Sequence, residues 1–507
     1  MSEHLFQKAN WFVERGAWRR LLSKQRLLLM FNCPILASRD LGLFILAWIL
    51  AGALPGFAAA PPQNPLLAKV QPDKRPSIIL IVADDLGYGD LGCYGQAKIK
   101  TPNLDQLAAE GLRFTQFYAG SGVCAPSRAT LLTGRHTGHT RIRRNADLPL
   151  RPEDLTVAEA LKGGGYRTCA VGKWGLGLEN STGTPNRKGF DEWLGCLGQL
   201  QAEEPYPTQL YRNELVLPLD KNLYGNHGQY AHDLFSMVAS NFVRVSKPFS
   251  FFLYLAYTLP HAQNGPPDQS TLLPGDAQSP TENWPPAEKR KAAMITRLDR
   301  DIGSLVQQLK SLKIEDDTVI FFTSDNGPHR DGGVNPAFFH SAGPLRGLKG
   351  DLYEGGIRVP MIARWPGRIK PGTVSDQVWA FWDFLPTAAE IAGVKASASI
   401  DGVSFLPTLL GQSQTNHHDF LYWESHERGS QQAVRMGDWK AVRLGPGQPL
   451  ELYDLQLDLG ETTNVANKHP EVVAKIEAYL KTARAASAEW RLLGAREAAK
   501  SEASEGK

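Results

Sequence analysis

Cysteine is scarce in this chain. Its 507 residues include only five cysteines, namely Cys33, Cys93, Cys124, Cys169 and Cys196. No two of them are spaced as Cys-x-x-Cys, so the usual signature of a structural zinc site is missing. Cys33 lies in an N-terminal leader. If Cys124 has a chemical role, three cysteines remain and at most one disulfide can form, which excludes a disulfide-stabilised scaffold.

The chain also has no large excess of positive or negative charge. The 55 basic and 52 acidic residues leave a formal net charge of +3. The first 60 residues contain seven basic and three acidic side chains, so the remainder carries a charge of −1. This balance gives no electrostatic sign of a nucleic-acid partner, and we expect none. No internal repeat is visible. A composition of 42% hydrophobic and 21% charged residues is that of an ordinary globular protein.

One uncharged stretch, residues 41–60, follows a basic N-terminal segment. Its apolar core runs from Leu41 to Leu54 and is followed by small residues up to Ala60. This pattern predicts a signal peptide within residues 1–60 and an exported protein. An uncleaved membrane anchor is the alternative, since the uncharged run approaches the length of a span. Met30 is a second possible start. Residues 61–76 are predicted to be a linker.

Residues 122–134 form the motif around which the chain is organised. They contain the pattern Cys124-x-Pro126-x-Arg128, followed by a short apolar stretch. This predicts a loop that continues into a helix, with Pro126 in the first turn. The helix N-terminus and Arg128 make the surroundings of Cys124 positive, which suits an anionic reactant. A small buried cysteine with no chemical role is the plainer interpretation.

Polar groups follow three apolar runs that are typical of buried parallel strands. The run at residues 77–83 ends in Asp84-Asp85, and the run at 318–324 ends in Asp325-Asn326. The run at 249–257 leads to His261. Ligands bind beyond the carboxyl ends of strands in α/β sheets, so these groups should converge. Three carboxylates and an amide oxygen are hard ligands, suited to Ca²⁺ or Mg²⁺ rather than zinc.

Other segments carry ordinary secondary-structure signals. Helices are predicted at residues 101–111, 152–161, 231–243, 287–312, 383–392 and 470–493. Further strands are predicted at 166–171, 361–364 and 452–455, with a hairpin at 433–443. Residues 263–290 are predicted to be a long surface loop and residues 496–507 a disordered tail.

From about Pro76 to Ala466 the chain resembles the type I sulfatases, more specifically the arylsulfatase and N-acetylgalactosamine-6-sulfatase type. The resemblance includes the Cys-x-Pro-x-Arg motif, the opening motif Asp-Asp-Leu-Gly-Tyr-Gly-Asp-Leu at residue 84, and blocks beginning at Arg346 and Tyr353. It implies an alkaline-phosphatase-like α/β fold, a large mixed sheet flanked by helices with a smaller C-terminal α+β domain. We place the catalytic domain at residues 77–414 and the C-terminal subdomain at 415–495.

The resemblance also implies the chemistry. A maturase would oxidise Cys124 to formylglycine, whose hydrate attacks the sulfur of a sulfate monoester and then expels sulfate. Asp325 could activate the hydrate, and His261 could protonate the leaving oxygen. The residues expected to stabilise the sulfate are Arg128, Lys173, His261 and Lys349. The expected metal ligands are Asp84, Asp85, residue 124, Asp325 and Asn326, with Ca²⁺ as the family's usual ion and Mg²⁺ as the alternative.

One position departs from the family pattern. The family usually has Gly-Lys-Trp-His where this chain has Gly172-Lys-Trp-Gly175, and that histidine is the usual base for sulfate release. We hypothesise that His136 or His139 supplies the missing base, provided that the chain reverses at Gly134 or Gly138. Two exposed loop histidines are the plainer interpretation.

The predicted function is hydrolysis of sulfated carbohydrate or aryl sulfate esters. Two alternatives stay open at this point. One is a phosphomonoester, phosphodiester or phosphonate hydrolase of the same fold. The other is a non-catalytic carbohydrate-binding protein, should Cys124 stay unmodified.

Overall fold

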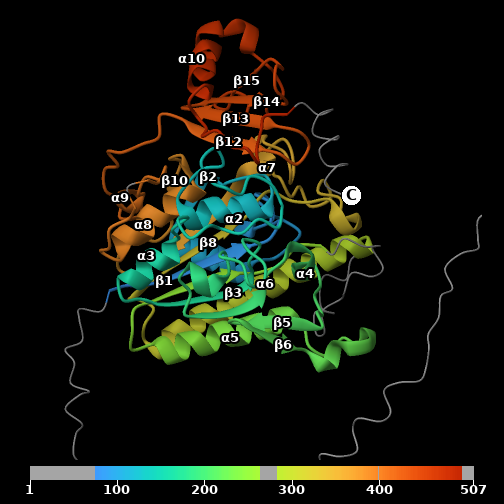
Figure 1. Ribbon diagram of the computed structural model, residues 1–507, viewed down its shortest axis with the longest axis vertical. Coiled ribbons are helices and arrows are strands. Elements are labelled where there is room, and N and C mark those ends of the chain that lie inside the picture. Colours follow the sequence, from blue (N-terminus) through green and yellow to red (C-terminus); the bar gives the residue numbers. More distant parts are fainter. Residues whose placement is uncertain (1–74, 263–282, 398, 494–507) are drawn as a thin grey trace, which may run out of the picture. The chain divides into compact units, whose positions relative to one another are not determined.

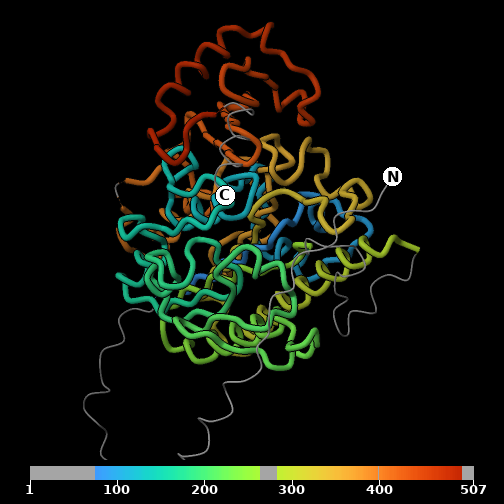
Figure 2. The backbone as a smooth tube through the Cα atoms, turned by 45° about the vertical axis from the view of Figure 1, so that its right-hand side comes forward, coloured from blue at the N-terminus to red at the C-terminus, as the bar shows by residue number. Residues whose placement is uncertain are grey.

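The computed structural model describes residues 75–262, 283–397 and 399–493 (Figures 1 and 2). The predicted leader, most of the linker, most of the loop at 263–290 and the tail lie outside these residues. In the part of the chain that is described, no helix is long and apolar enough to cross a membrane.

A large mixed sheet of eleven strands forms the centre of the described chain (Figure 1). Its strand order is β10-β2-β9-β8-β1-β7-β3-β4-β5-β6, and β11 also pairs with β2. The strands are β1 Ser77–Ala83, β2 Leu112–Tyr118, β3 Arg167–Lys173, β4 Glu192–Cys196, β5 Gln209–Arg212, β6 Leu215–Pro218, β7 Phe251–Ala256, β8 Thr318–Ser324, β9 Arg358–Arg364, β10 Thr373–Ser375 and β11 Trp379–Ala380.

The helices of the described residues are α1 Pro102–Ala109, α2 Cys124–Thr133, α3 Val157–Gly163, α4 Gln199–Ala202, α5 Ala231–Ser246, α6 Pro286–Leu312, α7 Glu354–Ile357, α8 Phe384–Ile391, α9 Leu406–Leu409 and α10 Pro470–Leu480. Both faces of the large sheet are covered: α2, α3 and α8 pack on one face, and α1, α5 and α6 pack on the other. Short 3-10 helices lie at Gly92–Tyr94, Pro185–Lys188, Asp220–Gly225, Asp331–Gly333, Phe381–Asp383 and Ala466–Lys468.

The position of strand β1 between two cores explains its continuous apolar sequence. Its side chains alternate between two cores: Ile78 and Leu80 pack with α2, α3 and α8, whereas Ile79 and Ile81 pack with α1, α5 and α6. A strand that is buried on both faces needs a continuous apolar run rather than an alternating one. The predicted strands at 77–83 and 318–324 are confirmed on this basis.

Two predicted helices differ from the structure by five or more residues at one end. Helix α3 begins at Val157 rather than at residue 152, because Thr156 and Glu159 form a capping box that starts it there. Helix α10 ends at Leu480 rather than at residue 493. Of the nine residues that follow, 481–489, only Ala483 is buried, so no apolar stripe continues the helix.

A second, antiparallel sheet of four strands lies near the C-terminus. Its strands are β12 Leu421–Ser425, β13 Gln431–Met436, β14 Trp439–Arg443 and β15 Glu451–Asp454. One face of this sheet packs on α10. The other face packs on a group of residues that includes Tyr118 of β2 and Trp382. Trp423 Nε1 also donates a hydrogen bond to Ala119 O at 2.9 Å. The predicted hairpin at 433–443 is the β13–β14 pair.

Buried charges join the two sheets. Lys440 Nζ on β14 lies 2.9 Å from Glu354 Oε1 and 3.4 Å from Glu461 Oε1. Burial favours the protonated form of Glu354, but Lys440 and Arg358 outweigh it and hold its pKa at about 2. Burial, opposed by Lys440 and reinforced by the Glu354 charge, raises the pKa of Glu461 to about 7. One ammonium therefore neutralises one of the two carboxylates at neutral pH.

Replacing Glu461 with glutamine should flatten the pH dependence of stability. Between about pH 4.5 and 7 the folded protein keeps a proton on Glu461 that the unfolded chain releases, so the free energy of unfolding falls as pH rises through this window. Glutamine cannot titrate, so urea unfolding of Glu461→Gln should lose less stability across the window than the wild type. Exposed Glu471→Gln is the matched control. Parallel wild-type and Glu461→Gln curves would contradict this assignment.

Candidate active site and metal centre

The carboxyl ends of three neighbouring strands meet at one edge of the large sheet. Strand β1 pairs in parallel with both β7 and β8. Asp85 N donates to Asp325 Oδ1 at 3.1 Å, and Asn326 Nδ2 donates to Asp85 Oδ1 at 2.7 Å. Asp84 N donates to Leu259 O at 3.0 Å, in the segment that leads from β7 to His261. The predicted convergence of the three strand ends is confirmed.

Helix α2 brings Cys124 to the same point. Cys124 is the first residue of the helix and is buried, and its Sγ lies 3.3 Å from Asp84 Oδ1. The next residue is fixed by Asn145, whose Oδ1 accepts a hydrogen bond from Ala125 N at 2.8 Å. Burial and the charges of Asp325 and Asp84 hold the pKa of the Cys124 thiol well above its usual value. The unmodified thiol would therefore be a poor nucleophile.

Three of the predicted sulfate-binding side chains contact these carboxylates. Arg128 Nη2 lies 2.7 Å from Asp325 Oδ2 and 3.7 Å from Asp84 Oδ2. Lys173 Nζ lies 2.8 Å from Asp84 Oδ2, and Lys349 Nζ lies 2.8 Å from Asp85 Oδ2. Positively and negatively charged side chains thus alternate in a buried site. Such a site can hold an anionic sulfate next to a metal cation.

His261 completes the group. Its Nε2 lies 3.1 Å from Lys349 Nζ and 3.4 Å from Asp85 Oδ2. Burial lowers the pKa of His261 to about 4 despite the nearby Asp85, so the imidazole is neutral at pH 7. Lys349 Nζ then donates a hydrogen bond to Nε2 of the neutral imidazole.

The three carboxylates of the site, Asp84, Asp85 and Asp325, lie close enough to repel one another. Burial tends to raise the pKa of Asp84, but Lys173, His261 and Arg128 hold it well below its usual value. For Asp85, Lys349 and His261 likewise outweigh burial and hold the pKa at about 2. Burial and the charge of Asp84 raise the pKa of Asp325 to about 6. A cation between the three would relieve this repulsion.

The donor atoms fit a hard divalent metal ion. One ligand atom from each of Asp84, Asp85, Cys124 and Asp325 lies within 4.8 Å of the others. Asn326 Oδ1 is buried and has no hydrogen-bond partner among the described residues, so a ligand oxygen is left over. A set of carboxylate and amide oxygens matches Ca²⁺ or Mg²⁺. This cluster could hold one such ion.

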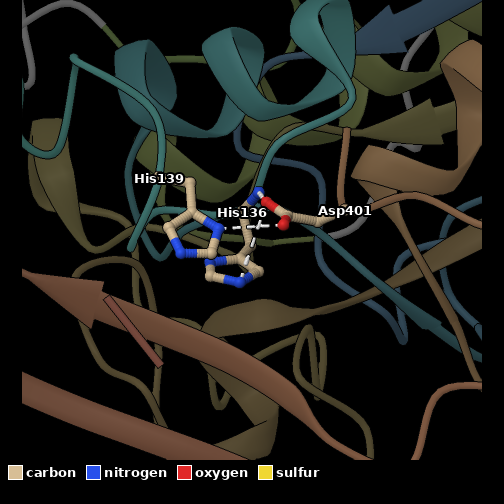
Figure 3. A group of neighbouring side chains, drawn as sticks. All are labelled: His136, His139 and Asp401. Carbon is tan, nitrogen blue, oxygen red and sulfur yellow. Dashed lines mark hydrogen bonds and ion pairs between the residues drawn. The ribbon is translucent and has the colours of Figure 1, made fainter. Parts of the chain in front are cut away.

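His136 and His139 lie elsewhere, which contradicts the hypothesis that either supplies a base at Cys124. Both point toward Asp401 (Figure 3), and His139 Nδ1 lies 2.8 Å from Asp401 Oδ1. They follow Thr133, the last residue of α2, whereas Cys124 is its first. A ten-residue helix spans about 15 Å. The chain does reverse at Gly134, but it turns toward Asp401, which donates through its backbone N to Gly134 O at 2.9 Å.

This histidine pair has the spacing of a metal site, yet its hydrogen bonds argue against one. His136 Nδ1 accepts from Gly138 N at 3.1 Å, which places the imidazole proton on Nε2. Nε2 is the atom that faces Asp401, at 3.7 Å. A protonated nitrogen has no lone pair for a metal. The cluster therefore joins the 134–139 loop to the 401 loop by hydrogen bonds.

The sequence interpretation missed two residues near the site. The rings of His329 and His261 are stacked with their centroids 6.0 Å apart, and His329 Nε2 lies 3.3 Å from Pro260 O. His329 follows the predicted ligand Asn326 by only three residues, a proximity that could have suggested it. Asn145 carried no such signal, because it reaches Ala125 from a segment 20 residues away.

Comparisons with known proteins agree with this site. The family described as sulfatase matches residues 76–394, and the family described as N-sulphoglucosamine sulphohydrolase, C-terminal, matches residues 349–486. The chain belongs to the sulfatase family. It is an enzyme that hydrolyses sulfate esters, as its motifs predicted, and the alkaline-phosphatase-like α/β fold is confirmed as well.

Individual relatives of this sulfatase extend over most of its length. It is 33% identical to human arylsulfatase A over 80% of this chain and 87% of that protein. It is 30% identical to the N-acetylgalactosamine-6-O-sulfatase of Bacteroides thetaiotaomicron over 85% and 98% of the two chains. The crystal structure of Ps i-CgsB in complex with k-i-k-neocarrahexaose superposes with a TM-score of 0.70 at 31% identity, covering 80% and 92%.

Proposed function

We propose that this sulfatase uses a formylglycine made from Cys124 to remove sulfate from sulfated carbohydrates. The observation that carries the proposal is the position of Cys124 at the start of α2, with Sγ 3.3 Å from Asp84 Oδ1. The hydrated aldehyde would supply one hydroxyl to attack the sulfur and a second to release the sulfate. A maturase is therefore a required partner.

The surrounding cations hold and polarise the sulfate. Arg128, Lys173 and Lys349 place positive charges in a buried site, where their attraction for the developing charge on the sulfate oxygens is strong. Asp325, whose carboxylate lies within 4.8 Å of Cys124 Sγ, is placed to accept a proton from the attacking hydroxyl. As the ester S–O bond breaks, the Lys349–His261 pair gives the proton of its hydrogen bond to the leaving oxygen and becomes neutral.

Asp84, Asp85, Asp325 and Asn326, with residue 124, are the proposed ligands of one Ca²⁺ ion. Mg²⁺ is the alternative. The ion would supply a positive charge beside the sulfate and the attacking oxygen. Three carboxylates and an amide oxygen favour Ca²⁺, which takes many oxygen ligands, whereas Mg²⁺ is usually bound by one or two carboxylates.

A pocket beside His261 supports a saccharide substrate. Its lining includes Glu203, Tyr230, Arg290 and Met294. An aromatic ring together with charged side chains is suited to a sugar that carries hydroxyl or acidic groups. Small aryl sulfates are expected to react as well.

We also propose that residues 1–60 direct export and that the catalytic domain spans residues 77–414, followed by the subdomain at 415–495. An exported protein fits the basic segment and uncharged stretch that precede the fold. If the leader is not cleaved, it would act as a membrane anchor.

The phosphonate alternative has weaker support. The phosphonate monoester hydrolase of Agrobacterium radiobacter has a TM-score of 0.59 at 22% identity, which is a likeness of fold alone. Phosphate monoesters carry more charge than sulfate monoesters, so relative activity on the two ester types separates these functions.

Mass spectrometry of the peptide spanning residues 114–135 tests the proposal. Protein made together with a maturase should contain an aldehyde or its hydrate at position 124 and should hydrolyse defined sulfated saccharides. Protein made without it should retain the thiol and be inactive. Full activity with an intact thiol would overturn the formylglycine mechanism. An aldehyde-containing protein that prefers phosphate or phosphonate esters would favour the first alternative. A protein that keeps the thiol when made with the maturase, and that binds saccharides without turnover, would favour the non-catalytic function.

A further inference from the structure

The side chain of Gln199 lies beside Gly175, at the edge of the proposed catalytic centre. The pairing of β3 with β4 continues past both strands: Trp174 N donates to Cys196 O and Gly175 N donates to Leu197 O, each at 3.0 Å. This pairing brings the start of α4, which is Gln199, next to Gly175. Gly175 is two residues beyond Lys173, whose Nζ contacts Asp84.

The amide of Gln199 fills the space that a side chain at position 175 would occupy. A Cβ atom built on Gly175 would lie 2.1 Å from Gln199 Nε2 and 3.9 Å from Ala125 Cβ. Ala125 is the residue after Cys124, in the first turn of α2. The backbone of Gly175 has a φ of +76°, which also favours glycine there. The Gln199 amide and the nucleophile's helical turn therefore border the same small space.

Gln199 Nε2 is buried and has no hydrogen-bond partner among the described residues. A buried amide N–H group without a partner is costly and is therefore uncommon unless a ligand or water satisfies it. Its neighbour on the same helix behaves differently: Gln201 Nε2 donates to Gln209 O at 2.9 Å. Of these two glutamines, only the one beside Gly175 has an unsatisfied donor.

We propose that Gln199 donates a hydrogen bond to an oxygen of the sulfate group held at residue 124. This inference rests on the proposed function, since it requires the sulfate to be bound there. An amide donates without titrating near neutral pH, so Gln199 stabilises negative charge on the sulfate but does not accept a proton when sulfate leaves. That proton goes to another group of the site.

The substitution Gln199→Met tests the donor while keeping a side chain of similar length in the space. A hydrogen bond to a charged oxygen is strong, so kcat/KM for a sulfate ester should fall on the order of 10- to 100-fold. Gln201→Met on the same helix is the matched control and should retain wild-type kcat/KM. Formylglycine content and the unfolding midpoint are measured for each protein, so that rates are compared per modified, folded site.

The substitution Gly175→Ala tests the same hydrogen bond without changing Gln199 itself. The added methyl group would displace the Gln199 amide, so this variant should show a similar loss, and Gly175→Ala with Gln199→Met should lose little more than either alone. Wild-type kcat/KM in modified Gln199→Met would overturn the Gln199 proposal and leave the sulfatase mechanism intact. If modified wild-type protein itself failed to hydrolyse sulfate esters, the proposed function would fail, and the proposal for Gln199 with it.

Discussion

A Cys124→Ser variant should react with a sulfate ester once and then stop. The serine hydroxyl occupies the position of Cys124 Sγ, 3.3 Å from Asp84 Oδ1 and near Arg128 and Lys173, so it can still attack the sulfur. Serine has no second hydroxyl on the same carbon, so the resulting sulfate ester has no internal route for release. Water would have to attack an anionic, crowded sulfur, and the steady-state rate should fall by a factor of about 1000 or more.

Rapid mixing with a chromogenic aryl sulfate checks this expectation. Cys124→Ser should release up to one equivalent of phenol per site and then become nearly inactive, and mass spectrometry should find one added sulfate on residue 124. Cys124→Ala should show no burst because it has no nucleophile. Cys93→Ser, which changes a cysteine outside the site, should turn over normally. Continuous turnover of Cys124→Ser at the wild-type rate would contradict the need for an aldehyde hydrate.

Some parts of the site could be predicted from sequence because they follow from strand periodicity. The apolar runs before Asp84 and Asp325 identify buried parallel strands, and the carboxyl ends of such strands meet at one edge of a sheet. The helix that begins at Cys124 was indicated by its proline and by the apolar residues that follow. The roles of these residues remain predictions, although the structure brings their side chains together.

Other parts depend on pairings that leave little trace in the sequence. Gln199 reaches Gly175 only because β3 and β4 pair beyond their ends, and β4 is a short strand whose Gly195 weakens the expected pattern. The base hypothesis for His136 and His139 failed because it required a chain reversal toward Cys124. The reversal at Gly134 exists but is directed by Asp401, a residue more than 250 positions away. Likewise, nothing local indicates that Lys440 contacts Glu354 and Glu461.

An Asp84→Ala variant should lose both the metal ion and turnover. Asp84 is a proposed metal ligand and also the contact of Lys173 Nζ at 2.8 Å, in a fully buried position. Removing it leaves the buried ammonium of Lys173 without its carboxylate, which typically costs about 3–5 kcal/mol of stability. It also removes one oxygen from the metal site, so kcat should fall by a factor of about 1000 or more.

Two measurements separate these effects. Added Ca²⁺ should raise the unfolding midpoint of metal-depleted wild-type protein, because an ion that binds only the folded state stabilises it, but should leave Asp84→Ala unchanged. Asp299→Asn is the matched control, since Asp299 is another buried aspartate that caps α1 through Leu104 N and should retain metal and activity. Adding Lys173→Met to Asp84→Ala removes the unpaired charge and should recover stability but not turnover. A stoichiometric metal content or near-normal kcat in Asp84→Ala would exclude Asp84 as a ligand and leave it only the role of pairing with Lys173.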